Sequence, residues 1–151
     1  MPRLIHAALP RYEFHTDVQV YISHVNQGGH LDNAQLLSLV SEARVRFFQA
    51  LGYREGQIEG TAVVVADMLA QYKSEAYHGE VLRIEMAAAD FNRYGFDLQF
   101  RMRELQTGRD VALGKTGIVF IDRQTRQVTP IPASTRERLQ AMADSAATQG
   151  A

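Results

Sequence analysis

One long amphipathic segment constrains the fold more than any other feature of this sequence. Apolar side chains recur at a spacing of about 3.6 residues after position 33, as on one face of an α-helix. This stripe consists of Leu36, Leu37, Val40, Ala43, Phe47, Phe48 and Leu51. Gly52 follows it and predicts a left-handed helix stop. This is the longest amphipathic helix expected in the chain, and the only structure that can cover its stripe is a sheet.

The remaining apolar residues follow patterns typical of strands. Residues 12–22 alternate between apolar and polar positions, which predicts a strand with one buried face. Residues 61–72 open with an unalternating run of Ala and Val, which favours a strand covered on both faces, either central or at a subunit contact. Alternating segments at 82–88 and 96–102, separated by a turn, predict a hairpin, and a further strand is expected at 111–121.

The order of these segments predicts an α+β fold with one domain over residues 1–151 and a core of about residues 11–132. A strand and a long helix come first, and at least three antiparallel strands follow, so a doubly wound nucleotide-binding fold is disfavoured. Ser134 and Glu137 have the spacing of a capping box, which predicts a short C-terminal helix. We expect a curved antiparallel sheet wrapped around the long helix.

Composition excludes several classes of protein. Sixteen Lys and Arg balance seventeen Asp and Glu, giving a net charge of −1, which argues against a nucleic-acid binder. The chain has no cysteine, which rules out disulfides, thiolate metal sites and cysteine nucleophiles. The five histidines show no ligand spacing, so no metal site is expected. No segment approaches the ~18 apolar residues of a membrane span, and we expect a cytoplasmic protein without membrane contact.

The segment before the long helix is a candidate site. Gln27, Gly28 and Gly29 stand just ahead of the expected helix start, where Asp32 or Asn33 is the capping side chain. Free N–H groups and the positive end of the helix dipole meet there, and glycines let a ligand oxygen approach the backbone. These three residues could therefore bind a substrate oxyanion. The alternative is that the glycines only form a turn.

The run Asn26-Gln27-Gly28-Gly29-His30-Leu31-Asp32-Asn33-Ala34, followed by Ser41-Glu42-Ala43-Arg44, resembles the hotdog-fold acyl-CoA thioesterases of the 4-hydroxybenzoyl-CoA thioesterase type. The resemblance extends over about residues 12–132. It implies a hotdog fold, hydrolysis of an acyl-CoA thioester, and a homodimer or homotetramer with active sites at subunit boundaries. Coenzyme A would enter as part of the substrate, and no separate cofactor is implied.

Asn26 departs from the family pattern, because the resemblance implies a catalytic Asp at this position. An amide can orient water or donate to a carbonyl oxygen, but it cannot accept a proton. His30 is the first replacement base to consider, since imidazole titrates near neutrality, although a structural hydrogen bond is the alternative role. Asp32 could orient His30, but a helix cap also explains it.

Other candidates have weaker support. Glu42 falls nearly opposite the apolar stripe, which favours a solvated or subunit-facing position. Asp67 interrupts an apolar strand and could be paired, exposed at an interface, or supplied to a partner's site. For coenzyme A, we expect Tyr72, Lys73 and Arg93 to meet phosphate and adenine, although basic residues at strand ends are usually only solvated.

Two functions remain open from the sequence. In the leading interpretation, water attacks the thioester of an acyl-CoA while backbone N–H groups around Gly29 and His30 polarise the carbonyl oxygen. The alternative is a hotdog protein that binds acyl-CoA or an acyl-carrier thioester without hydrolysing it, which the missing carboxylate at Asn26 supports.

Overall fold

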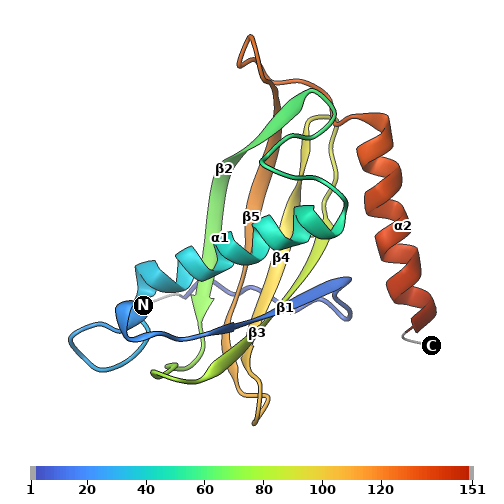
Figure 1. Cartoon of the computed structure of the whole chain (residues 1–151). Helices are drawn as coiled ribbons and strands as arrows, with labels where there is room; N and C mark the ends of the chain where they lie inside the picture. Colours follow the sequence, from blue (N-terminus) through green and yellow to red (C-terminus); the bar gives the residue numbers. More distant parts are fainter. Residues whose placement is uncertain (1–2, 150–151) are drawn as a thin grey trace.

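The computed structural model describes residues 3–149 and confirms the expected order of elements (Figure 1). The two residues at each end of the predicted domain lie outside this described part. Along the chain, the structure contains β1 (Phe14–Gln19), a 3-10 turn (Ile22–His24), α1 (Asn33–Ala50), β2 (Thr61–Tyr72), β3 (Val81–Ala89), β4 (Gly95–Glu104), β5 (Asp110–Asp122) and α2 (Ala133–Gln149).

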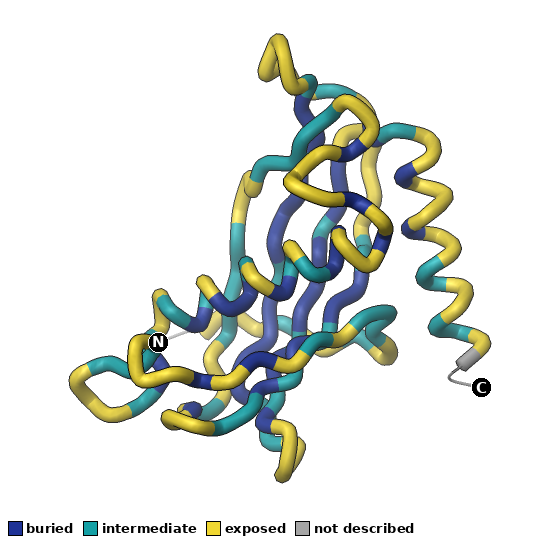
Figure 2. Tube along the Cα trace, in the orientation of Figure 1, coloured by how far each residue is buried: buried dark blue, intermediate teal, exposed yellow. Residues whose placement is uncertain are grey.

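The strands form one antiparallel sheet in the order β1-β3-β4-β5-β2. The sheet curves around α1, as Figure 1 shows, and its central strands are buried along most of their length (Figure 2). Aromatic rings join the helix to the sheet, because Phe47 meets Phe14 edge to face at 5.7 Å and Phe48 approaches Phe96 at 6.5 Å. The α+β hotdog architecture is thus confirmed.

Helix α1 forms where the apolar stripe predicts it. Its core-facing side chains are fully or nearly fully buried: Leu36, Leu39, Val40, Ala43, Phe47 and Phe48. Gly52 ends the helix with a φ of +95°, a conformation that side chains with a Cβ rarely adopt. Burial of this stripe holds the N-terminus of α1 in a fixed position over the sheet.

Strand β2 lies at the edge of the sheet, so the expectation of a central position is wrong. Among the described strands only β5 pairs with it, and the ladder shifts register between Val65 and Asp67. Val65 is 45% exposed, and the run of small apolar residues is only partly covered within the chain. An apolar edge strand leaves backbone groups open to pairing, so a subunit contact along β2 remains a prediction.

Helix α2 is longer than expected and starts earlier. It spans 17 residues and begins at Ala133, so Ser134 lies inside the first turn and the predicted capping box is wrong. Instead, the carbonyl of Pro132 accepts the N–H groups of Thr135 and Arg136. The buried hydroxyl of Thr135 lies 2.9 Å from the Tyr53 hydroxyl, which ties α2 to the segment after α1. Within residues 3–149, no helix combines the length and apolar character needed to cross a membrane.

Candidate active site

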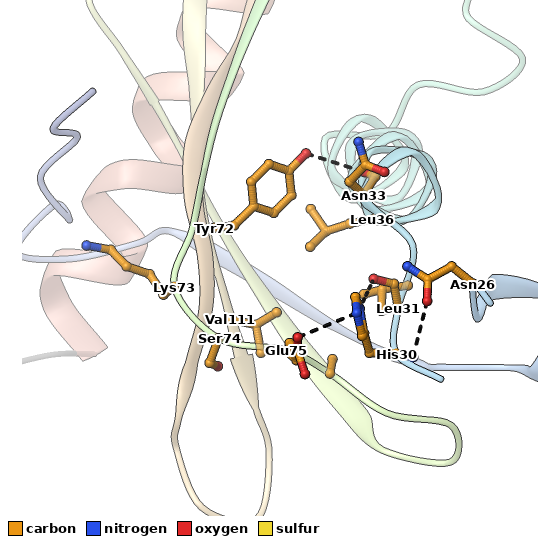
Figure 3. A pocket seen from close by; sticks show the side chains of 11 residues that line it. Asn26, His30, Leu31, Asn33, Leu36, Tyr72, Lys73, Ser74, Glu75 and Val111 are labelled. Carbon is orange, nitrogen blue, oxygen red and sulfur yellow. Dashed lines mark hydrogen bonds and ion pairs between the residues drawn. The ribbon is translucent and has the colours of Figure 1, made fainter. Parts of the chain in front are cut away.

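A cavity of about 360 Å³ lies where the loop before α1 meets the end of β2 (Figure 3). Its walls come from three parts of the chain: the loop and first turn of α1, the segment after β2, and the start of β5. The lining residues are Asn26, His30, Leu31, Asn33, Leu36, Tyr72, Lys73, Ser74, Glu75, Ala76 and Val111. The cavity therefore contains two of the predicted catalytic residues, two of the predicted coenzyme-binding residues and an apolar wall.

Asn26 organises the loop before α1. Its side-chain Oδ1 accepts the N–H groups of Gly28 at 3.0 Å and His30 at 3.4 Å, and its backbone oxygen accepts the N–H of Gly29 at 3.0 Å. The amides considered as donors to an acyl oxygen are therefore already bonded within the loop. Gln27, Gly28 and Gly29 are exposed and do not line the cavity, and a substrate oxygen could bind the Gly28 or Gly29 amide only by displacing Asn26.

This hydrogen bonding fixes which way the Asn26 amide points. Because Oδ1 serves the loop amides, Nδ2 occupies the other side of the side chain, where Asn26 lines the cavity (Figure 3). Nδ2 carries two N–H donors and no acceptor. Asn26 therefore presents a hydrogen-bond donor where a carboxylate would present a base.

His30 lies between two acceptors. Its Nδ1 is 3.4 Å from the carbonyl oxygen of Leu31, and its Nε2 is 3.5 Å from Oε1 of Glu75. A Cβ added at Gly28 would lie 3.2 Å from His30 Nε2, so the glycine leaves room for the ring. Because Nε2 faces a carboxylate, this contact favours the tautomer with the N–H on Nε2, which makes His30 a hydrogen-bond donor to Glu75.

Glu75 is the site residue that the sequence interpretation missed. Figure 3 shows its carboxylate directed toward His30, and the Tyr77 hydroxyl donates to Oε2 at 3.0 Å. This hydrogen bond raises the pKa of Tyr77 above its usual value. The signal that could have identified Glu75 was its position, because a carboxylate follows the strand end whose Tyr72 and Lys73 were assigned to substrate binding.

The predicted coenzyme-binding residues do not all come together. The Tyr72 hydroxyl donates to the backbone oxygen of Asn33 at 3.4 Å, which joins β2 to the first turn of α1. Lys73 also lines the cavity, although Figure 3 shows its side chain directed away from His30 and Glu75. Arg93 lies in the β3–β4 turn, at the end of the sheet where β2 begins, whereas the cavity lies where β2 ends.

Asp32 is the N-cap of α1, which was one of its two predicted roles; the other was to orient His30. Its side chain accepts the N–H groups of Ala34 at 2.9 Å and Gln35 at 3.2 Å. These bonds satisfy two of the helix-start amides that would otherwise be open. The cap fixes the helix start beside the cavity, and the structure gives no contact between the Asp32 carboxylate and the His30 ring among the described residues.

Replacing Asp32 separates capping from chemistry. Asp32→Ala should lower the free energy of unfolding by about 1 kcal/mol, because the two amides lose their acceptor. Asp32→Asn should retain both stability and turnover, since asparagine caps helices about as well as aspartate. Chemical denaturation and steady-state assays of the two variants check this expectation. A large loss of kcat in Asp32→Asn with normal stability would instead assign a catalytic role to the carboxylate.

Two other carboxylates are accounted for by ion pairs. Glu42 is exposed on α1, as its place opposite the apolar stripe predicts. It pairs with Arg46 at 3.6 Å. Asp67 lies 2.7 Å from Lys115, which also contacts Asp97 at 3.0 Å. Neither Glu42 nor Asp67 lines the cavity. Among residues 3–149, no group of three or more acidic or histidine side chains is arranged to hold a metal ion.

Solved structures share this fold. A 1,4-dihydroxy-2-naphthoyl-CoA thioesterase from Synechocystis superimposes with a TM-score of 0.77 at 17% identity, covering 84% of this chain and 95% of that one. A thioesterase from Thermus thermophilus, complexed with coenzyme A and Zn, gives a TM-score of 0.78 at 24% identity, covering 89% of this chain and 96% of that one.

Sequence comparison identifies the family. A 1,4-dihydroxy-2-naphthoyl-CoA hydrolase from Synechococcus elongatus is 31% identical over 115 residues, which cover 74% of this chain and 83% of the relative. The family model described as thioesterase-like superfamily matches residues 20–139, which include the loop before α1, the whole cavity and the first turns of α2. The chain belongs to the thioesterase-like superfamily.

Proposed function

We propose that this protein is an enzyme that hydrolyses the thioester bond of an acyl-CoA. The observation that carries the proposal is the meeting of a donor amide, an imidazole and a carboxylate around one cavity at the start of α1, from Asn26, His30 and Glu75. Thioester hydrolysis needs a donor for the carbonyl oxygen and a group that activates water. Family membership and the names of the relatives support the same reaction.

The size and lining of the cavity favour an acyl-CoA substrate whose acyl group is compact and largely apolar. Leu31, Leu36 and Val111 supply the apolar part of its lining. Tyr72 and Lys73 at its mouth offer an aromatic face and a cation to the coenzyme A portion. Because one relative is named for an aromatic acyl-CoA, aromatic thioesters are the first substrates to test. Coenzyme A belongs to the substrate, and the proposal includes no separate cofactor.

The proposal includes a homodimer or homotetramer in the cytoplasm. The open edge of β2 and its exposed Val65 favour pairing between two copies of this strand. In an antiparallel pair, the end of β2 beside the cavity would approach the partner's opposite end. Arg93 lies at that opposite end, so it could serve the partner's site, as the sequence-based expectation for coenzyme binding requires.

Asn26 is the group that we assign to the substrate carbonyl. As water attacks, negative charge develops on the thioester oxygen, and the Nδ2 donors of Asn26 stabilise that charge in the cavity. The loop amides hold Oδ1, so the donor is fixed before the substrate binds. Asn33, the first residue of α1, lines the same cavity, so the positive end of the helix dipole lies beside it.

Thiol release from a panel of acyl-CoA thioesters tests the proposal. We expect turnover of at least one member among short-chain, long-chain and aromatic acyl-CoAs, with the mass of the active species measured by light scattering. Calorimetric binding of an acyl-CoA without thiol release would instead support the non-hydrolytic binding protein. A fully active monomer would contradict the subunit contact along β2.

A further inference from the structure

We infer that Glu75 is the general base of the reaction, and that His30 positions it; the inference rests on the proposed thioesterase function. The need for such a group comes from Asn26, which cannot accept a proton. Glu75 is the one carboxylate among the described residues that line the cavity. It follows β2 in sequence and therefore reaches the cavity from the side opposite the Asn26 loop (Figure 3).

The contacts of the Glu75 carboxylate suit this role. Oε1 lies 3.5 Å from His30 Nε2, and Oε2 accepts the Tyr77 hydroxyl at 3.0 Å. A carboxylate has about four acceptor positions, so two remain for a water molecule. The carboxylate side chain is 57% exposed, which leaves it accessible from the cavity. Arg109, the residue just before β5, donates to the Glu75 backbone oxygen at 3.0 Å and holds the segment in place.

The geometry gives His30 a different part. Its ring is held between the Leu31 carbonyl and Glu75, and Nε2 faces the Glu75 carboxylate, to which an N–H on this nitrogen can donate. An N–H at Nε2 orients the Glu75 carboxylate. His30 is therefore a positioning residue, as the orienting partner of a base is in other hydrolytic sites.

The proton and bond changes balance without a further reactant. Glu75 accepts a proton from water as the water oxygen bonds to the thioester carbon, giving a tetrahedral oxyanion held by Asn26. Re-formation of the carbonyl breaks the carbon–sulfur bond and expels the coenzyme A thiolate. Protonated Glu75 then gives its proton to that thiolate. The carboxylic acid product loses its own proton to solvent, and Glu75 returns to its starting state.

Glu75→Gln tests the assignment, because glutamine has nearly the same shape but cannot accept the proton. We expect kcat to fall about 100-fold with little change in KM and in melting temperature. The decline of kcat/KM toward acidic pH, which reports protonation of the base, should disappear in this variant. Glu75→Asp should recover part of the lost kcat. His30→Ala should lower kcat about 10-fold while keeping the acidic decline.

Glu42→Gln is the matched control, since Glu42 is an exposed carboxylate of α1 that pairs with Arg46 and does not line the cavity. Its kcat should stay within about 2-fold of wild type. Wild-type protein without turnover on any thioester would contradict the proposed function itself. Wild-type turnover combined with an unchanged kcat, or an unchanged acidic decline, in Glu75→Gln would overturn only the role of Glu75.

Discussion

Asn26→Asp should lower kcat by about 100- to 1000-fold, although the substitution restores the residue that the family resemblance implies at this position. The variant keeps Oδ1, so the N–H groups of Gly28 and His30 retain their acceptor and the loop should fold normally. The donor Nδ2 becomes an anionic oxygen facing the cavity. That charge would repel the negative charge that develops on the thioester oxygen and would also lie near Glu75. Steady-state thiol release gives kcat directly.

Asn92→Asp provides a closely matched control. The Asn92 Oδ1 accepts the N–H groups of Tyr94 at 2.8 Å and Gly95 at 3.0 Å, so this side chain also organises a turn, between β3 and β4, by accepting two backbone amides. This variant makes the same chemical change outside the cavity and should keep wild-type kcat. If Asn26→Asp instead gains hydrolysis over an inactive wild type, the donor assignment is wrong and the binding protein is the better interpretation.

The fold could be predicted because it depends on local periodicity. The stripe from Leu36 to Leu51 and the alternation in the 82–88 and 96–102 segments each specify one buried face, and the structure uses these faces as expected. The position of β2 could not be predicted in this way. A run of Ala and Val shows that both faces avoid charge, but it does not distinguish a central strand from an edge strand.

Of the candidate site, the part before α1 could be predicted from local sequence, but the part that follows β2 could not. The residues before α1 could be assigned because glycines and a capping Asp32 mark a helix start in sequence. Glu75 is 45 positions after His30, and the two meet only because β2 returns the chain to the helix start. The sequence also does not show the side-chain hydrogen bonds of Asn26, which occupy the Gly28 and His30 amides that the helix start predicts to be open.

Phe47→Ala should lower the free energy of unfolding by about 3–5 kcal/mol. Phe47 is fully buried at the centre of the α1–sheet contact, and its ring meets Phe14 at 5.7 Å and Phe48 at 5.6 Å, both edge to face. Alanine leaves a cavity between helix and sheet that these rings cannot fill. For a domain of this size, the loss corresponds to a melting temperature about 10 °C lower or more.

Val45→Ala on the same helix is the control, because Val45 is 49% exposed and its truncation leaves no buried cavity. Its free energy of unfolding should change by less than about 1 kcal/mol. Denaturant titration of the two variants, followed by circular dichroism, compares them directly. Loss of the Phe47 contact should also loosen the active site, because this contact holds α1, whose first residue lines the cavity, against the sheet. Equal losses in the two variants would contradict a core centred on Phe47.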